Sequence, residues 1–229
     1  FETPEVFATF AHHEEWGLRI MTDPECDLSQ VLSILLGESL PRLIAIMDGT
    51  VEKPFLHEIV SSQLDVDRLD YLLRDQSCTG ADVGGFDHER LLRSLGVSED
   101  GHLVVGLDSV GAVEAYLVTR WHMYQLVYFH KLNMLTQAYY VRALKRAREL
   151  HENGDLPLSL KMRDMLSNRE LTPLRYAGLT DSFVIADVFQ WAGHDDPVLS
   201  NCARRLSSRD DFHKRIRLEL TKEQAEILI

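Results

Sequence analysis

The chain has 229 residues, of which 45% are hydrophobic and 26% are charged, a balance typical of one globular domain or of a domain with an appendage. Its 36 acidic residues against 24 Lys and Arg give a formal net charge of -12, which argues against general affinity for nucleic acid. No apolar run reaches about 18 residues and no signal segment opens the chain, so we expect a cytoplasmic protein without a membrane span.

Two further features concern the chain as a whole. Cys26, Cys78 and Cys202 show no close paired spacing, so we expect reduced, mostly structural thiols. The sequence opens at Phe1 without a Met and ends within an apolar pattern. We therefore expect a fragment of a longer protein.

The first candidate functional residues lie in a helical pattern that ends near Met21. His13 and Glu14 are adjacent there, and such a pair can supply proton-transfer groups or metal ligands. An exposed polar turn is the commoner explanation of the same residues. Apolar residues at helical spacing then predict three core helices, at 28–36, 39–47 and 54–62.

The stretch 64–75 predicts an amphipathic helix. Its apolar residues fill one arc at about 100° per residue. A second arc carries Asp67, Arg68, Tyr71 and Asp75 on successive turns. Such a row could hold a metal, a phosphate and a sugar hydroxyl at once. An ordinary helix with a solvated acidic face explains the row equally simply.

A glycine-containing loop follows this helix and ends at Asp87. This residue is predicted to cap a helix at 88–95, and residues 103–105 are predicted to form a short strand. A glycine-rich loop before a helix can hold phosphate, although no strand precedes this one.

The next tract, 109–152, is helical in pattern and unusually long. We expect two helices or one bent helix. Its middle interleaves aromatic residues with Arg120, Tyr124, His130 and Lys131. An arginine there could bind a phosphate, and a tyrosine could stack on a base. A buried aromatic stripe with cations at its rim explains the same residues.

The last third is expected to form an appendage, residues 154–229, to a first domain at 1–153. It is rich in Arg and Lys toward its end, which favours a solvated or interface surface. The predicted elements are helices at 158–167, 181–192 and 197–206 and a strand at 215–220.

One string carries a family resemblance. From Asp65 to Asp75 the chain reads Asp-Val-Asp-Arg-Leu-Asp-Tyr-Leu-Leu-Arg-Asp. This string resembles the second-aspartate helix of HD-domain phosphohydrolases, specifically the branch of the sterile-alpha-motif/HD dNTP triphosphohydrolases and their bacterial relatives. The resemblance extends over roughly residues 6–150. The other matching residues are His13, Glu14, Phe86, Asp87, Arg90, Arg120, Tyr128, His130 and Lys131.

The resemblance implies an all-α fold, an HD-type helical bundle with small β elements, followed by a mixed C-terminal lobe. It implies metal-dependent hydrolysis of deoxynucleoside triphosphates to deoxynucleoside and triphosphate. The metal would be Mg²⁺, Mn²⁺ or Fe²⁺, with Asp67 as one ligand. The family's other three ligands, a His and a His-Asp pair, are expected upstream of Phe1, because the His-Asp at 194–195 lies far downstream in a predicted turn.

The resemblance also implies roles for the remaining residues. Arg68 and Arg120 would contact the phosphates. At position 68 relatives often have Lys, and the Arg here keeps the charge but changes the donor geometry. Proton transfer falls to His13, oriented by Glu14. The other roles are sugar contact near the 3′-hydroxyl for Tyr71 and Asp75, base or sugar contact for Tyr128, a regulatory nucleotide for Arg90, and an oligomer interface or effector nucleotide for His130 and Lys131.

As partners, the resemblance implies a dNTP substrate, an effector nucleotide and a homo-oligomer, either a dimer or a tetramer. Two alternatives stay open at this point. One is an HD phosphohydrolase that acts on another nucleotide phosphoester. The other is a non-catalytic module for nucleotide binding or assembly.

Overall fold

The computed structural model of the chain describes residues 6–8, 11–167 and 170–208, and its fold is all-α apart from one hairpin. The expected fold class is thereby confirmed. In the hairpin, β1 (Leu95–Val97) pairs antiparallel with β2 (Leu103–Val105). The α-helices are α1 (His13–Thr22), α2 (Asp27–Leu36), α3 (Leu40–Asp48), α4 (Pro54–Glu58), α5 (Val66–Thr79), α6 (His88–Ser94), α7 (Val110–Met123), α8 (Lys131–Glu152), α9 (Leu160–Leu166), α10 (Pro173–Ala177), α11 (Asp181–Gln190) and α12 (Pro197–Ser208).

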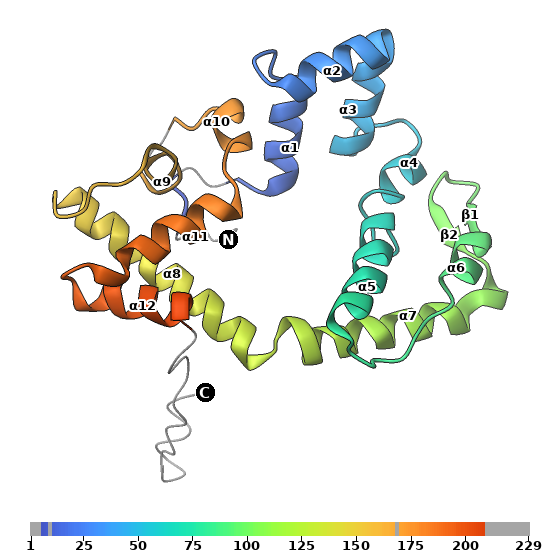
Figure 1. Ribbon diagram of the computed structural model, residues 1–229. Helices are drawn as coiled ribbons and strands as arrows, with labels where there is room; N and C mark the ends of the chain where they lie inside the picture. Colours follow the sequence, from blue (N-terminus) through green and yellow to red (C-terminus); the bar gives the residue numbers. More distant parts are fainter. Residues whose placement is uncertain (1–5, 9–10, 168–169, 209–229) are drawn as a thin grey trace, which may run out of the picture.

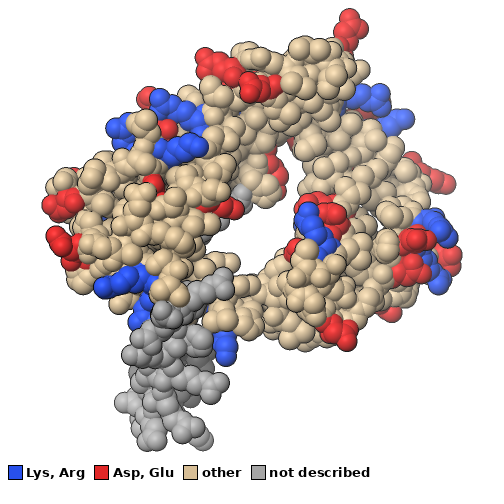
Figure 2. Space-filling view, in the orientation of Figure 1, with Lys and Arg blue, Asp and Glu red and all other residues tan. Residues whose placement is uncertain are grey.

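The helices are arranged as a ring around an open centre (Figure 1). Helices α1 to α3 form one part of the ring, α5 and the hairpin another, and α7 leads into α8 and the C-terminal helices. The ring closes where α10 contacts α1. In the space-filling view the centre is an opening through the molecule (Figure 2). Helices α1 and α5 therefore lie on opposite sides of this opening.

Among the described residues, two separate hydrophobic cores lie in different parts of the ring. The larger one joins α8 to α9, α11 and α12, and Leu144, Met162, Val188 and Leu199 are fully buried there. The smaller one joins α5, α6 and α7 around Leu72, Leu91, Tyr116 and Met123. The first core crosses residue 153, so α8 packs with the helices that follow it. The division into 1–153 and 154–229 stays a prediction.

The expectation that the three early helices form core is wrong, since α2 buries only Ser29 and neither α3 nor α4 has a buried residue. In α2, Ile34 is 82% exposed and Leu35 is 73% exposed. The stretch Asp27–Asp48 is also long and apolar enough to cross a membrane by composition. In this structure it is not one straight helix, because it turns at Gly37, whose φ of 49° favours glycine, and continues as α3.

The expected break in the long tract is confirmed, and it is a π-helical turn at Tyr124–Tyr128. The amide of Phe129 donates to the carbonyl of Tyr124 at 2.8 Å, which closes the wider turn. His130 then caps α8, accepting a hydrogen bond at Nδ1 from the Leu132 amide at 3.3 Å. Single π turns often occur at functional sites. The predicted strand at 215–220 lies outside the described residues.

Candidate functional site

The start of α5 is fixed by a buried carboxylate. Asp65 is 4% exposed, and its Oδ1 accepts a hydrogen bond from the Arg68 amide at 2.7 Å, which makes it the N-cap. Its Oδ2 accepts hydrogen bonds from the Ser62 amide at 3.0 Å and from Arg68 Nε at 2.9 Å. The Arg68 guanidinium is thus held at the first turn of α5, where the N-terminal helix dipole also favours a bound anion.

A second arginine reaches toward α5 from α7. Arg120 Nη1 donates to the side-chain oxygen of Gln63 at 3.2 Å. The Tyr116 hydroxyl donates to the backbone carbonyl of Gln63 at 2.8 Å. Gln63, in the segment that precedes α5, therefore binds two side chains of α7. The Arg120 guanidinium also lies over the Tyr124 ring, 5.7 Å from its centroid. Burial raises the pKa of Tyr116 on α7, and the nearby charges of Arg120 and Arg68 oppose this rise, so both arginines lie at the interface of α5 with α7.

The π turn places two tyrosines against the same helix. Tyr128 donates its hydroxyl to Asp75 Oδ2 at 2.8 Å. Its ring meets the Tyr71 ring edge to face at 6.2 Å and the Tyr124 ring at 5.0 Å. An aromatic wall with one carboxylate at its end suits a ligand that has a flat apolar part and hydroxyl groups.

The electrostatics of this cluster keep its phenols protonated. Burial raises the pKa of Tyr128, and the hydrogen bond to Asp75 raises it further. Burial, followed by the nearby Tyr124, raises the pKa of Tyr71. Burial alone would lower the pKa of Arg120, but its hydrogen bond with Tyr124 and the neighbouring phenols raise it overall. At neutral pH the cluster therefore offers neutral phenol donors beside a fixed positive charge.

Asp67 lies in the first turn of α5 and is exposed. Among the residues that the structure describes, no group of three or more His, Cys, Asp or Glu is placed to hold a metal ion. A lone carboxylate does not fit a divalent ion, which needs several oxygen or nitrogen ligands. The described residues by themselves thus do not complete a metal site.

The predicted proton-transfer pair is placed elsewhere. His13 and Glu14 are both exposed, and His13 Nε2 lies 3.4 Å from Glu14 Oε1. Their helix α1 lies across the opening from α5 (Figure 1). The structure therefore does not bring this pair to the cluster of α5 and α7, and its catalytic role stays a prediction.

The residues predicted for a regulatory nucleotide lie on two different elements, α6 and the start of α8. Arg90 on α6 donates through Nη2 to the carbonyl of Asp108 at 2.5 Å, at the edge of a pocket of about 390 Å³. His130 caps α8, and Lys131 is the exposed first residue of that helix. Arg90 already has protein partners, so a ligand there would have to replace them or bind beside them.

Two residues of the cluster, Asp65 and Gln63, were given no role in the sequence analysis, whereas Tyr124 was named there as a candidate. Asp65 binds Arg68, Gln63 binds Arg120, and Tyr124 stacks under Arg120. Asp65 had a signal in the sequence, since an Asp before an amphipathic helix favours an N-cap. No local pattern identifies Gln63, because its partners Tyr116 and Arg120 are more than fifty residues away.

Comparison with known families identifies this architecture. The family model described as the HD-associated region matches residues 86–228. The chain belongs to this family. The match begins at Phe86, so it includes α6, α7 and α8 but not the α5 string that carries the resemblance to HD phosphohydrolases.

Curated relatives of the chain are described as uncharacterized proteins. YwfO of Bacillus subtilis is 31% identical over 202 residues, which cover 87% of this chain and 46% of that protein. MJ1154 of Methanocaldococcus jannaschii is 30% identical over 131 residues, which cover 56% of this chain and 28% of that protein. The chain thus spans less than half the length of either relative.

Solved structures share the fold. A phosphohydrolase from Bacteroides thetaiotaomicron matches with a TM-score of 0.78 and 29% identity, over 90% of this chain and 52% of that one. A hypothetical protein from Aquifex aeolicus matches with a TM-score of 0.61 and 26% identity, over 87% of this chain and 52% of that one. The helical arrangement is therefore that of an HD-type phosphohydrolase fold.

Proposed function

We propose that this chain supplies the part of an HD-type phosphohydrolase site that binds the nucleotide, and that the substrate is a deoxynucleoside triphosphate. The observation that carries the proposal is the convergence of α5 and α7. Arg68 and Arg120 lie near the start of α5, Asp75 and Tyr128 lie further along this helix, and Tyr71 lies between the two groups. Cations near the start of the helix and phenols further along it match the two halves of a nucleotide.

The arginines would bind the phosphate chain. Each is held by an uncharged amide or a single carboxylate, Gln63 for Arg120 and Asp65 for Arg68, so donors of both guanidinium groups remain for phosphate oxygens. Arg120 Nη1 would exchange the Gln63 oxygen for a phosphate oxygen that carries more negative charge. This exchange favours binding of a triphosphate over binding of a neutral nucleoside.

The tyrosines and Asp75 would bind the nucleoside. Asp75 Oδ2 already accepts the Tyr128 hydroxyl, and its second oxygen can accept a sugar hydroxyl. The rings of Tyr71 and Tyr128 meet edge to face and would exclude water beside the sugar. A nucleoside has a sugar hydroxyl that can donate to the second oxygen of Asp75. An inorganic phosphate chain has no such hydroxyl, so this contact would favour the nucleotide.

A divalent metal would polarise the phosphoryl group and activate water in such an enzyme. We propose Asp67 as the ligand that this chain contributes, and Mg²⁺, Mn²⁺ or Fe²⁺ as the metal. The described residues do not complete that site. The chain's own residues bind and orient the nucleotide.

The proposal is tested with protein expressed from its full reading frame. A panel of dNTPs, nucleoside monophosphates and cyclic nucleotides is incubated with Mg²⁺ or Mn²⁺, and products are identified by chromatography. Release of triphosphate from a dNTP supports the proposal, and turnover of another phosphoester alone would reject the dNTP assignment. Asp67→Ala should abolish metal-dependent turnover with the fold intact, and unchanged turnover would reject the role of Asp67.

A second candidate function is nucleotide binding without catalysis. It is supported by the same cluster, since Arg120 and Tyr128 could bind a nucleotide without a metal. In that case dNTP binding, measured by calorimetry, would depend on Arg120 and Tyr128 but not on added metal. No product would form from any nucleotide of the panel.

A further inference from the structure

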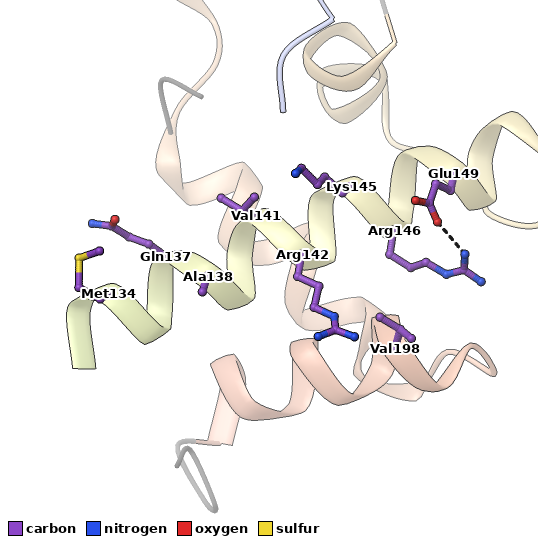
Figure 3. A pocket seen from close by; sticks show the side chains of 9 residues that line it. All are labelled: Met134, Gln137, Ala138, Val141, Arg142, Lys145, Arg146, Glu149 and Val198. Atoms are coloured by element: carbon purple, nitrogen blue, oxygen red, sulfur yellow. Dashed lines mark hydrogen bonds and ion pairs between the residues drawn. The ribbon is translucent and has the colours of Figure 1, made fainter. Parts of the chain in front are cut away.

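A strip along α8 lines an open trough of about 670 Å³ (Figure 3). Its lining residues on α8 recur at intervals of three and four, which is the spacing of one helix face. Val198 of α12 forms the other wall. A trough with one long helical wall suits a second helix better than an enclosed small molecule. We call it the α8 strip: Met134, Gln137, Ala138, Val141, Arg142, Lys145, Arg146, Glu149 and Val198.

The α8 strip is apolar at one end and positively charged at the other. Met134, Ala138 and Val141 form its apolar row, and Arg142 and Lys145 follow toward the C-terminal end of α8. Figure 3 shows Arg142 reaching toward α12 and Lys145 extending from the other edge of the same helix face. Both side chains are exposed, although the chain as a whole has a formal net charge of -12. Because two exposed cations lie together at this end of the strip, an acidic partner is favoured there.

Helix α2 has the complementary character. Leu28, Val31 and Leu35 are 47%, 49% and 73% exposed, at helical spacing along its outer side. Asp23, Glu25 and Asp27 lie at its start, and no Lys or Arg occurs from residue 20 to residue 41. An exposed apolar row of this size marks an interaction surface.

The two rows match in length. Residues 28–35 of α2 and 134–141 of α8 each span seven helical steps, or about 10 Å at 1.5 Å per residue. An antiparallel arrangement sets the acidic start of α2 beside Arg142 and Lys145. Within one copy, α2 and α8 lie on different sides of the ring (Figure 1). Contact between them therefore requires two copies.

We propose that α2 of one copy of this chain docks antiparallel on the α8 strip of a second copy. Pairing of α8 with α8 is disfavoured, because it would oppose like charges. The proposal is independent of the enzymatic activity proposed above, since neither surface includes a residue of the cluster at α5 and α7.

The test is the oligomeric state of the full chain, measured by sedimentation velocity. Arg142→Glu with Lys145→Glu should weaken self-association by about tenfold or more, and so should Glu25→Lys with Asp27→Lys. Arg93→Glu with Arg163→Glu makes the same charge change on α6 and α9 and should leave self-association unchanged. Circular dichroism confirms that each variant is folded.

Mixing the two interface variants gives the decisive measurement. Each variant alone has like charges at the interface, whereas the mixture pairs a basic α2 with an acidic α8 strip and the reverse. The mixture should therefore associate although neither variant does. Leu35→Asp gives an independent variant that removes the apolar contact without changing α8.

Several outcomes would overturn the proposal. A monomeric parent chain at all concentrations would do so, as would self-association that both double variants and Leu35→Asp leave unchanged. Failure of the folded variants to associate on mixing would also reject the pairing of α2 with the α8 strip.

Discussion

The two cores of this molecule differ in what they bury. The core around α8, α9, α11 and α12 is built from aliphatic residues such as Leu144, Val188 and Leu199. The region between α5 and α7 also buries hydrocarbon, but it includes tyrosines whose hydroxyls bind Gln63 and Asp75. The first region therefore supplies stability to the ring, whereas the second holds polar groups in position where a ligand can reach them.

Substitution of Arg120 should give the largest loss of activity, with little change in stability. Arg120→Ala removes a cation that is only partly buried, so the melting temperature should change little. The value of kcat/KM for a dNTP should fall by about 10²–10³, or about 3–4 kcal/mol, as for the loss of one charge-stabilising donor. Arg120→Lys keeps the charge, so its kcat/KM should fall less. An equal loss of kcat/KM in both variants would contradict the phosphate role.

The aliphatic core should respond in the opposite way. Leu144→Ala creates a cavity at a fully buried position and should lower the free energy of unfolding by about 3 kcal/mol. The exposed Leu160 on α9 is the matched control, and Leu160→Ala should cost much less. Urea denaturation measures both, and equal costs would remove the distinction between core and surface in this region.

Besides the hydrophobic core, one carboxylate links α8 to α12. Asp196 Oδ1 accepts the Leu199 amide at 2.8 Å and caps α12, while its Oδ2 accepts Arg146 Nη2 at 2.7 Å. Asp196→Ala should therefore cost about 2 kcal/mol of unfolding free energy. Asp196→Asn keeps the cap and should cost less, which urea denaturation would show. Equal costs would mean that the cap contributes little.

The stabilising effect of Asp196 should depend on pH. The hydrogen bond from Arg146, followed by the Leu199 amide, lowers the pKa of Asp196 to about 2. A group whose pKa is lowered on folding stabilises the protein above its ordinary pKa and loses this contribution as the pH falls. The difference in melting temperature between the parent and Asp196→Asn should thus shrink below about pH 4. A difference that grows toward pH 3 would contradict this assignment.

Tyr128 should have a smaller effect on binding than Arg120. Tyr128→Phe keeps the ring contacts but removes the hydrogen bond to Asp75, which should weaken nucleotide binding by about tenfold, or about 1.4 kcal/mol. Calorimetric titration with a dNTP measures this loss. Tyr140→Phe on α8 is the matched control, and an equal effect there would show that the Asp75 contact is not specific.

The smallest change in stability is expected for the hydrogen bond between His102, beside the hairpin, and Glu58. His102 Nδ1 lies 2.6 Å from Glu58 Oε1; this hydrogen bond raises the pKa of His102 and lowers that of Glu58. The His102 contribution is lost as the pH rises through its raised pKa, and that of Glu58 is lost in acid. Relative to His102→Gln, the parent should be most stabilised between about pH 5 and 6. Melting curves across pH measure this, and a pH-independent difference would contradict it.

Local patterns predicted much of the helical framework. The cap at Asp87 and the break in the long tract both occur as expected. The strand at β2 was predicted, but its partner β1 was not, because residues 95–97 follow a helix directly and carry only a short apolar signal. Helix α10 was also missed, since it spans only one turn.

The sequence by itself determined that the chain is helical, that α5 has one polar face, and that Asp67, Arg68, Tyr71 and Asp75 share it. These features depend on residues within a few turns of one another. Only the tertiary structure decided that Gln63 meets Arg120, that Tyr128 meets Asp75, and that α1 lies across the opening from both. The physical reason is that contacts between distant segments depend on how the helices pack and on a π turn, and neither leaves a periodic signal in the sequence.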